Sequence, residues 1–476
     1  MNLNQTLQEK YPHLEVSVLK LSEVKKNIDF RIDDSFWTMK LIYNNKLNYK
    51  KIGECLLKSQ YGISINMNEE GDGVPIYRMN DIDNMLCNFE VKKYALIDKN
   101  ELQTFRLNYG YVLFNRTNSY EFVGRTGIFY NNRENFVFAS YLVRLVCNKE
   151  ILLPEYLTVF LNTHIGKKEI RRRARPSINQ TNVNPEELKE IKIPIFPMEF
   201  QLEIQNLVKD SHKALEESKE LYKKAEETLY LELGLDPKNP LQSLLDSKID
   251  HSIKSLNISI RTLKESFLKT GRLDSEYYQS KYEDIEKFIK SYPNGYDSFS
   301  SIINNKDTNF TPKNNENYSY IELANIGNNG NISEPISDLG KNLPTRARRI
   351  VSKGDVIISS IEGSLSSCAL ITQEFDKHLV STGFFVLNSK LLNGETLLVM
   401  FKSQIFQEYL KKFPSGTILC AINKEELSKI LIPKIDSTTQ EKIAKYIQES
   451  FNLRKKSKQL LDNAKIKVEE QIQGKI

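Results

Sequence analysis

The chain contains 476 residues, 40% of them hydrophobic and 10% aromatic, so it is long enough to form two or more domains with separate cores. Its formal net charge of +6 is modest, so binding to a polyanion would require a local basic surface. Five dispersed cysteines, an opening unlike a signal peptide and the lack of an apolar run of about 20 residues predict a cytoplasmic protein with no membrane contact.

A long internal repeat organises the sequence. The first copy contains RIDDSFW at residues 31–37, and the second contains RLDSEYY at residues 272–278, which is 241 positions later. Further along, PEELKEIKIPIF from Pro185 corresponds to KEELSKILIPKI from Lys424 at a shift of 239. Because two long copies span almost the whole chain, we expect two α+β domains related by pseudo-symmetry, and not a solenoid of short units.

The same order of elements is expected in both copies: a short helical opening, a β-rich body, a helix, a short strand ending in Ile-Pro, and a long charged helix. In the first copy, apolar and polar residues alternate between Gly and Asn clusters, which predicts strands over residues 50–150. Helices are predicted over residues 156–170 and, in the second copy, from Leu397.

The charged helix of the first copy, from Glu199 to Leu233, has apolar or small residues at alternating spacings of four and three, which is a heptad pattern. Its seam consists of Ile204, Val208, Ser211, Leu215, Ser218, Tyr222, Ala225 and Leu229. The second copy repeats the pattern at Ile443, Ile447, Ser450, Arg454, Ser457, Leu461, Ala464 and Val468. We expect these helices to pair with each other as rods of roughly 45 Å. The alternative is that each helix lies on its own domain.

The repeat and the heptad segments define the expected domain boundaries. They are a first domain at residues 1–198, a helical spacer at 199–235, a linker at 236–255, a second domain at 256–438 and a second helical spacer at 439–476.

Motifs for catalysis, nucleotide binding or metal binding are missing from the sequence. It contains neither a P-loop nor a Gly-x-Gly-x-x-Gly turn, and its five histidines are not spaced as metal ligands. Asp355 and Glu362 lead into Gly363 and are interpreted as part of a strand and a turn, not as nuclease ligands. We therefore expect no catalytic residues, no metal site and no cofactor.

Two basic segments indicate contact with a polyanion. Residues 167–175 read KKEIRRRAR, and residues 345–349 read TRARR just before a predicted strand. Phosphate is the natural partner of such density, because each neutralised phosphate releases a counterion. Alternatively, the first segment is a solvated helical face and the second a solvated loop. The stretch of the second copy that matches the first segment, with Lys411 and Lys412, has less charge, so the two domains are not expected to bind identical sequences.

Several short segments carry a likeness to a known family. They are GYVLFNRTNS from Gly110 and GDVIISSIEGS from Gly354, FASYLVRL around Ala139, and the pattern Asn-x-x-x-Leu-x-x-Ile-x-Ile-Pro at Asn184–Pro194 and Asn423–Pro433, with Gln201 and Gln440 opening the long helices. In this order, and occurring twice, they resemble the specificity subunits of type I restriction-modification systems. The resemblance covers nearly the whole chain.

The resemblance implies two target recognition domains, each reading one half of a bipartite site in double-stranded DNA. It implies that an antiparallel coiled coil of two long helices fixes the gap between the half-sites. It also implies that these helices and nearby surfaces dock two DNA methyltransferase subunits, with a translocating restriction subunit joining later, and that the chain itself is not an enzyme. Two positions depart from the family pattern: Tyr111 replaces the usual acid after the glycine, and Ile361 stands where the first copy has Arg116 and Thr117.

The DNA contacts are expected from basic, amide and hydroxyl side chains, since arginine suits guanine or phosphate and asparagine suits adenine. For the first domain the expected contacts are Arg78, Asn80, Asn115, Arg116, Arg172, Arg173, Arg175 and Asn179. For the second domain they are Asn325, Asn328, Arg346, Arg348, Ser359, Ser360, Lys411, Lys412 and Thr417.

The sequence leaves other functions open. The RIDDSFW and RLDSEYY segments also resemble the specificity modules of type IIB/IIG-like enzymes, which combine cleavage and methylation in one partner polypeptide. A scaffold that binds only proteins would make weak, salt-insensitive contact with DNA, whereas a DNA reader loses affinity steeply as salt rises. An enzyme would need a site that the sequence does not display.

Overall fold

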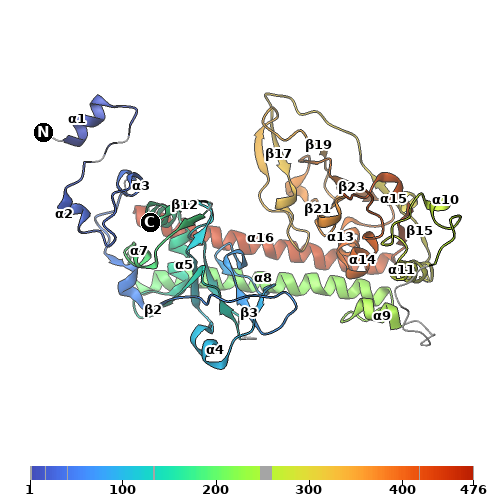
Figure 1. Cartoon of the computed structure of the whole chain (residues 1–476), viewed down its shortest axis with the longest axis horizontal. Coiled ribbons are helices and arrows are strands. Elements are labelled where there is room, and N and C mark those ends of the chain that lie inside the picture. Colours follow the sequence, from blue (N-terminus) through green and yellow to red (C-terminus); the bar gives the residue numbers. More distant parts are fainter. Residues whose placement is uncertain are drawn as a thin grey trace. The chain divides into compact units, whose positions relative to one another are not determined.

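The computed structural model divides the chain into two compact units, unit 1 (Met1–Leu215 with Lys455–Ile476) and unit 2 (Glu216–Arg454). The structure describes residues 3–14, 16, 18–39, 41–131, 135–178, 180–246, 260–416 and 419–474 (Figure 1). Both units combine helices with sheets, so the predicted α+β class is confirmed. Every helix in the described ranges is too short or too polar to cross a membrane.

Unit 1 contains one large sheet and three smaller ones. The large sheet has the order β2 (Leu56–Tyr61), β11 (Leu142–Cys147), β7 (Tyr111–Asn115), β9 (Thr126–Phe129), β5 (Leu86–Cys87) and β4 (Ile82–Asp83). The smaller sheets are β10 (Val137–Phe138), β3 (Val74–Tyr77) and β6 (Tyr94–Ala95); β12 (Arg175–Ser177), β13 (Gln180–Asn182) and β8 (Thr117–Asn118); and β1 (Tyr49–Lys51) with β14 (Lys192–Pro194).

The helices of unit 1 are short except where the two long helices enter it. The short ones are α1 (Leu3–Lys10), α2 (Leu21–Val24), α3 (Asp34–Thr38), α4 (Lys99–Phe105), α5 (Pro154–Asn162), α6 (His164–Arg173) and α7 (Pro185–Lys189), with 3-10 turns η1 (Ile52–Cys55) and η2 (Met79–Asp81). The long ones are α8 (Met198–Glu232) and α16 (Ser437–Gln473), each of which contributes residues to both units.

Unit 2 contains two four-stranded sheets and one strand pair. The first sheet has the order β16 (Ile303–Asn305), β23 (Phe384–Ser389), β20 (Val356–Ser359) and β21 (Cys368–Leu370). The second has the order β18 (Ile336–Leu339), β17 (Asn317–Ile321), β22 (Leu379–Ser381) and β19 (Ala347–Ile350). In the strand pair, β15 (Tyr296–Ser298) lies beside β24 (Leu431–Pro433). The predicted loop TRARR is in fact partly strand, because β19 includes two of its arginines.

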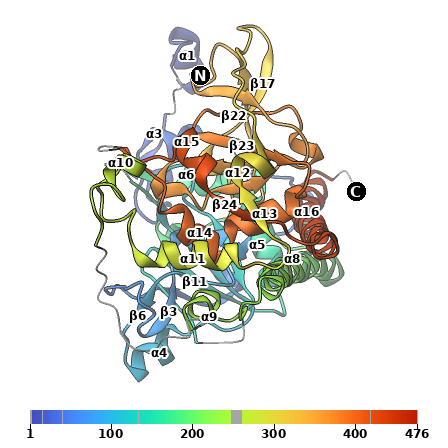
Figure 2. The same ribbon diagram turned by 90° about the vertical axis from the view of Figure 1, so that its right-hand side faces the viewer.

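The helices that lie wholly in unit 2 are short. They are α9 (Pro240–Asp246), α10 (Phe267–Thr270), α11 (Ser280–Lys290), α12 (Phe299–Ile302), α13 (Gly394–Lys402), α14 (Gln404–Leu410) and α15 (Lys424–Lys429), with 3-10 turns η3 (Leu323–Asn325), η4 (Glu362–Ser364) and η5 (Gln373–Phe375). Two of these helices, α12 and α13, contact the first sheet of the unit. Figure 2 shows α14 beside α11, against which it packs.

The two units share one framework. The strand order β2-β11-β7-β9 of unit 1 corresponds to β16-β23-β20-β21 of unit 2, and a parallel pair, β3 with β10 or β17 with β22, occurs in each. The strands that end in Ile-Pro pair in the same register, Tyr49 with Pro194 and Tyr296 with Pro433. The sequence repeat is therefore also a repeat of topology.

The glycines that open the repeated strand motif have a conformational reason. Gly110 and Gly354 directly precede the strand β7 and the Asp355–β20 segment, with φ angles of +83° and +87°. Side-chain-bearing residues rarely adopt such angles, whereas glycine does so without strain. After the turn, the central residues of both strands are fully buried, which explains the apolar runs that follow each glycine.

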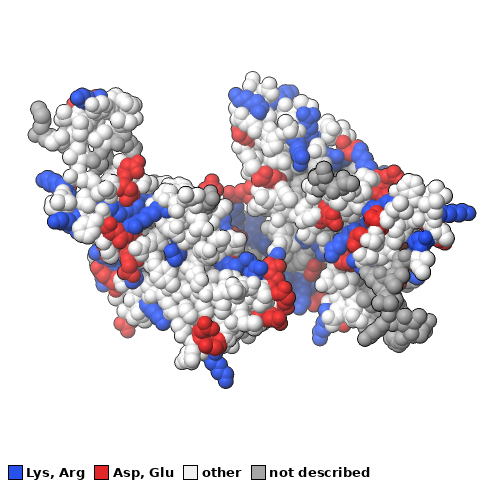
Figure 3. Space-filling view, in the orientation of Figure 1, with Lys and Arg blue, Asp and Glu red and all other residues white. Residues whose placement is uncertain are grey.

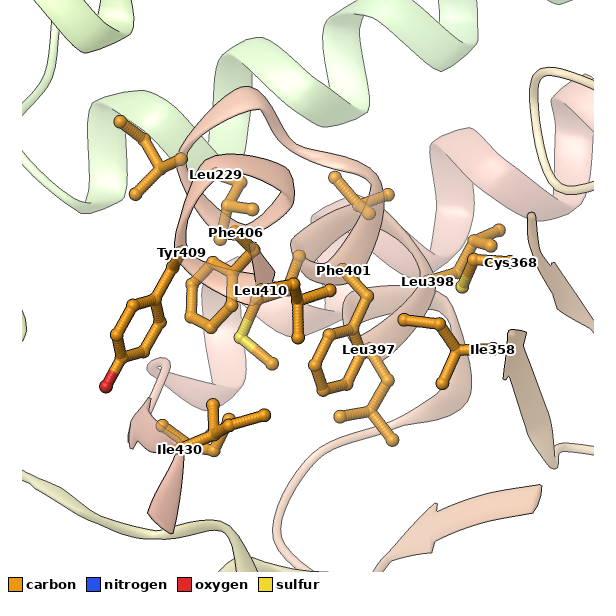
Figure 4. Packing of buried hydrophobic residues seen from close by; sticks show 14 of the residues in the cluster. Leu229, Ile358, Cys368, Leu397, Leu398, Phe401, Phe406, Tyr409, Leu410 and Ile430 are labelled. Atoms are coloured by element: carbon orange, nitrogen blue, oxygen red, sulfur yellow. The ribbon is translucent and has the colours of Figure 1, made fainter. Parts of the chain in front are cut away.

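Each unit packs a broken helix pair on its main sheet. The sequence predicts one continuous helix over residues 156–170, but the structure breaks it at Thr163, whose hydroxyl accepts from the backbone N–H of Gly166 at 3.1 Å and caps α6. Ser403 caps α14 in the same way. In unit 2, α13 and α14 pack their apolar side chains onto Ile358 of β20 and Cys368 of β21, while Leu229 of α8 joins the same cluster (Figure 4).

The glutamine that opens each long helix fixes that helix to its unit. Gln201 accepts from the backbone N–H of Leu153 at 2.9 Å and donates to the carbonyls of Ile151 at 3.1 Å and Phe196 at 3.0 Å. Both ends of its amide are satisfied in the interior, where an unpaired polar group would be costly.

Gln440 does the same in unit 2. It accepts from the N–H of Asn393 at 2.9 Å and donates to the carbonyls of Leu391 at 3.1 Å and Ile435 at 2.9 Å. The two glutamines therefore play one structural role, which explains their equivalent places in the repeat.

In unit 1, α8 and α16 pair antiparallel. Ser211 and Ser457 are both buried, and their hydroxyls lie 2.8 Å apart. Glu203, earlier on α8, pairs with Lys467, later on α16, at 2.7 Å, so the helices run in opposite directions. The apolar seam residues of α16 belong to the core of unit 1.

In unit 2 the other halves of these helices pair in the same sense. The Ser218 and Ser450 hydroxyls lie 3.0 Å apart, and Thr439 donates to Glu232 at 2.8 Å. The predicted heptad seam is confirmed: of its sixteen members, only Leu215 and Arg454 are not fully buried. Pairing between the two copies of the helix, and not packing of each on its own domain, is what the structure contains.

Glu226 on α8 gives unit 2 a pH-dependent stability. Burial raises the pKa of its carboxyl to about 7, although Lys402 acts in the opposite direction. Because the folded-state pKa lies above the unfolded value, the fold binds this proton more tightly, and stability is lost as the pH rises through about 7. We expect Glu226→Gln to stabilise the chain over wild type by up to about 3 kcal/mol at about pH 8.5 and by much less at about pH 5.5.

Urea unfolding at both pH values measures this difference. Glu220→Gln is the control, because Glu220 is exposed on the same helix and is not among the charges that shift the pKa of Glu226. A stability gain for Glu226→Gln that is the same at both pH values would contradict the assignment.

Candidate nucleic-acid interface

Strand pairing brings together two loops of unit 1 that are far apart in the sequence. β13, in the hairpin after α6, pairs with β8, which follows β7, and Thr117 donates to the Asn182 side chain at 2.5 Å. The N–H of Val183 donates to the carbonyl of Arg116 at 2.8 Å. The structure thus unites two segments that the sequence analysis singled out separately, the loop with Arg116 and the hairpin with Arg175. We call this pair of loops the unit 1 loop sheet.

The corresponding loops of unit 2 pair in the same way. Ala421 bridges both Ser415 and Ile361, and the N–H of Ile422 donates to the carbonyl of Ser360 at 2.8 Å. The unit 2 loop sheet therefore has the same backbone plan with different side chains. Serines occupy the strand end where the first copy has Asn115 and Arg116.

Arginines and exposed aromatic rings alternate beside the unit 1 loop sheet. The Arg116 guanidinium lies 5.0 Å from the centre of the Tyr61 ring. Arg125 lies 4.1 Å from the centre of the Phe122 ring, and the three rings Tyr61, Tyr120 and Phe122 are each more than 40% exposed. Arginine and aromatic faces in one surface suit stacking and phosphate contact with nucleic acid.

Arg171 belongs to the same surface, 5.7 Å from the centre of the Tyr120 ring. Next to it, the pKa of Lys167 is lowered by partial burial and by the nearby positive charges of Lys465, Arg171 and Arg125. Such a gathering of like charge is unfavourable for the isolated protein and favours an anion. We call Arg116, Arg125, Lys167 and Arg171 the basic cluster.

Most of this surface is not predicted by the sequence. Arg125, Tyr61, Tyr120 and Phe122 are not among the expected contacts, and Arg171 is predicted only as part of the basic run. A signal was present, since an arginine and four aromatic residues lie within residues 120–130. Their proximity to α6, however, depends on long-range packing: a Cβ on Gly124 would lie only 2.5 Å from Ile170 of that helix.

Two expected contacts of unit 1 are internal. Asn115 is fully buried and accepts from the N–H of Thr117 at 3.4 Å. Arg173 is buried in an ion cluster in which it pairs with Glu169 and, at 3.7 Å, with Glu187. Direct DNA contact is not available to either residue as the structure places them, because each lies beneath the surface.

Other expected contacts of unit 1 are held by the protein itself. Arg172 donates to the carbonyl of Phe36 at 2.7 Å and lies 4.4 Å from the centre of that ring. Arg175 is exposed but pairs with Asp29 and, at 3.5 Å, with Glu187. Arg172 and Arg175 of the basic run thus make contacts within the protein that stabilise the fold. Arg78 is half-buried and lies 3.8 Å from Asp81, Asn80 is exposed, and Asn179 lies outside the described residues.

In unit 2, Ser359 and Lys412 are internal. The Ser359 hydroxyl lies 2.7 Å from that of Ser364, and Lys412 pairs with Glu286 at 2.5 Å. Half-buried Ser360 donates to the carbonyl of Gly383 at 2.9 Å. For the first two, burial again removes direct contact with DNA.

The remaining expected contacts of unit 2 divide into exposed and structural residues. Asn328, Arg346 and Arg348 are exposed, and Lys411 is exposed but pairs with Glu408 at 2.7 Å. Asn325 accepts from the N–H of Glu322 at 2.8 Å and donates to the carbonyl of Glu334 at 2.8 Å, so it closes a turn. Thr417 lies outside the described residues.

The two exposed arginines among the expected contacts of unit 2, Arg346 and Arg348, lie beside and in β19. In the face drawn in Figure 3, Lys and Arg gather at the end of unit 2 that carries β17 and β19, whereas acidic and basic residues are mixed over the rest of that unit. This end and the unit 2 loop sheet are the two candidate contact areas of the unit. No cluster of three metal-binding side chains occurs among the described residues.

The burial of Arg173 makes a prediction that separates folding from binding. Arg173→Met would leave buried Glu169 without its arginine partner, which typically costs about 3–5 kcal/mol, and would remove one of the three arginines that lie near Glu187. The exposed neighbour Arg171→Gln should change stability by less than about 0.5 kcal/mol. Chemical denaturation of both variants measures this, and equal stability of the two would show that the ion cluster does not hold the fold.

Comparison with known proteins gives a consistent family. Residues 46–227 match the family model described as the type I restriction modification DNA specificity domain. The MjaX type I restriction enzyme specificity subunit of Methanocaldococcus jannaschii is 22% identical over 425 residues, which cover 88% of this chain and 91% of that protein. The EcoKI specificity subunit of Escherichia coli is 27% identical over 161 residues, 33% of this chain and 34% of that one.

Among solved structures, the S subunit of a type I restriction-modification system from M. genitalium aligns with 90% of this chain and 96% of its own, at 15% identity and a TM-score of 0.41. The family model and the sequence relatives carry the assignment. Residues 46–227 of this chain thus match a type I restriction modification DNA specificity domain, and the chain is similar over most of its length to a type I restriction enzyme specificity subunit.

Proposed function

We propose that this chain is the DNA-reading, non-catalytic subunit of its restriction-modification complex. Unit 1 reads one half of a bipartite site in double-stranded DNA and unit 2 reads the other half. The long helices set the distance between the half-sites and dock two DNA methyltransferase subunits, and a translocating restriction subunit joins that assembly. This division of labour places the chemistry in the partners.

One observation carries this proposal: the two units repeat a framework but differ in the side chains of the same loops. Arg116 in unit 1 corresponds to Ser360 in unit 2, although both residues accept the same backbone hydrogen bond at 2.8 Å. A duplicated scaffold with unlike loops is what a reader of two different half-sites requires. Identical loops would instead favour a symmetric site.

We propose a revised set of residues that contact DNA, chosen for their exposure. In unit 1 the set is the basic cluster with Arg175 and Asn80, which are exposed or half-buried and can offer guanidinium, ammonium or amide groups. In unit 2 it is Asn328, Arg346, Arg348, Ser360 and Lys411. Asn179 and Thr417 keep their sequence-based proposal. Asn115, Arg173, Ser359 and Lys412 are proposed to support the surface from below.

Splitting the site between two units increases discrimination. Each mismatched base pair costs roughly 1–3 kcal/mol, and costs at separate positions add, so two modest readers select steeply together. A continuous helix of 35 residues spans about 50 Å, which exceeds one turn of DNA at about 34 Å. Helices of this length suit a fixed separation of the half-sites.

The basic cluster predicts a salt dependence. Each lost phosphate contact should reduce the slope of log affinity against log salt by about 0.9. We expect the triple variant Arg116→Gln, Arg125→Gln, Arg171→Gln to lower the slope by roughly 2–3, measured by fluorescence anisotropy with the methyltransferase-containing complex. Lys99→Gln is the control, because Lys99 is exposed on α4, on the opposite side of unit 1 from β12 (Figure 1).

Wild-type binding to DNA that is weak and insensitive to salt would contradict the proposed function and favour a protein scaffold. Copurification with one polypeptide that carries both nuclease and methyltransferase activities would instead identify a type IIB/IIG-like partner. The two results are distinguishable, since only the second preserves sequence-specific binding.

The helices predict a spacer rule. Seven residues, one heptad, inserted after Leu215 and after Arg454 would keep both seams in register and lengthen each helix by about 10 Å, or about three base pairs. Selection from random duplexes should then return the same half-sites with a spacer longer by about three base pairs. An unchanged spacer would show that the helices do not set it. Insertion of one heptad in the described surface loop at Gly71 serves as the control.

A further inference from the structure

The duplicated motif Arg-x-Asp holds the chain at the point where each helix ends and each loop hairpin begins. In unit 1, Arg31 donates to the carbonyl of Arg173 at 2.8 Å and to that of Ala174 at 3.4 Å. Asp33 fixes the guanidinium through two bonds, of 2.7 and 2.6 Å. The Arg31 side chain is only 3% exposed, so water does not compete for these bonds.

Unit 2 contains the same arrangement. Arg272 donates to the carbonyls of Phe413 at 3.2 Å and Pro414 at 2.8 Å, and Asp274 accepts two bonds from it, of 2.7 and 2.9 Å. The arginines are 241 residues apart, and the paired carbonyls are 240 apart. The repeat thus preserves this contact although the segments that lead to the bound carbonyls, IGKKEIRRRA and IFQEYLKKFP, have little sequence in common.

We call each Arg-x-Asp pair, together with the two backbone carbonyls that its arginine binds, a clamp. Aromatic residues that follow the motif pack against it. Phe36 lies against Arg31 at 4.7 Å and against Arg172 at 4.4 Å, so the ring connects the motif to the end of α6. Tyr277 lies against Arg272 at 4.6 Å and against Lys412 at 4.9 Å, at the end of α14. Two basic side chains that the sequence offered as DNA contacts therefore anchor the clamp instead.

The clamped carbonyls lie at or just beyond a helix end: Arg173 is the last residue of α6, whereas Phe413 and Pro414 follow the end of α14 at Leu410. Carbonyls at such places have no partner inside the helix and need donors from elsewhere. A planar guanidinium can supply two parallel donors at fixed geometry, whereas a lysine ammonium is a single flexible point charge. The next residues after the clamped carbonyls begin the hairpins that join the two loop sheets. The direction in which each hairpin leaves its helix is therefore set by one arginine.

We propose that Arg31 and Arg272 are positioning residues for sequence recognition, each of which governs one half-site and not the other. Neither touches DNA; each acts through the hairpin that it orients. The inference rests on the proposed function, because it assigns to the two clamps separate halves of the DNA sequence that the units read.

The test compares Arg31→Lys with Arg272→Lys in the full chain bound to its methyltransferase subunits, using selection from a random double-stranded DNA library. Arg31→Lys should reduce discrimination at one half-site by about tenfold and leave the other half-site and the spacer unchanged. Arg272→Lys should do the reverse. Each variant is thus the matched control for the other.

Asp33→Asn and Asp274→Asn provide a second pair that is expected to fold, because these side chains are 41% and 45% exposed. Each should loosen the guanidinium and give the same half-site effect, of several-fold. Thermal unfolding of all four variants shows whether the fold is retained.

Loss of thermal stability with unchanged half-site preference would assign the clamps a structural role alone and overturn the inference. Equal weakening of both half-sites would overturn it as well. A wild-type complex that enriches no sequence would instead overturn the proposed function, and the inference with it.

Discussion

The fold depends on an exchange of helices between the two copies of the repeat. The core of unit 1 includes Leu461, Ala464 and Val468 of α16, which belongs to the second copy. The core of unit 2 includes Tyr222 and Leu229 of α8, which belongs to the first. Burial of each such large apolar side chain contributes roughly 1.5–3 kcal/mol, so each unit is stabilised by residues from the opposite half of the sequence. The antiparallel seam is therefore part of both cores and not an addition to them.

Around this seam, the parts that repeat and the parts that vary are physically separate. Gln201 with Gln440, and Arg31 with Arg272, keep their hydrogen-bond partners at equivalent backbone positions in both units. Their partners are mostly carbonyls and N–H groups, which every residue possesses. Side chains in the loops can therefore change without loss of these anchors. This separation allows one scaffold to present two different surfaces.

Features that depend on local pattern could be predicted from the sequence. The heptad seam follows from spacing alone, and the strand after Gly110 follows from a turn residue and an apolar run. Features that depend on long-range packing could not. Arg173 lies in a basic run that appears solvent-facing in sequence, yet Glu169 and Glu187 draw it inside. The density of charged residues in a segment does not reveal which of them form buried ion pairs.

The surface beside the unit 1 loop sheet illustrates the same limit. Arg125 and Phe122 lie in an aromatic segment, but only the packing of Gly124 against Ile170 brings them next to α6. The break at Thr163 was equally hidden, because a hydroxyl residue within an apolar helix can either cap a new helix or face its own backbone. The composition of this surface therefore depends on packing that the sequence does not display.

The exchanged helices also have a consequence for biosynthesis. Ser211 and Ser457 pair across 246 residues, so the apolar stripe of α8 in unit 1 stays uncovered until the end of α16 has left the ribosome. At a translation rate of about 5–20 residues per second, this interval lasts on the order of tens of seconds. Neighbouring nascent chains on one polysome would then expose the apolar stripe of α8 to each other. The supply of chaperones would govern the yield of correctly folded molecules.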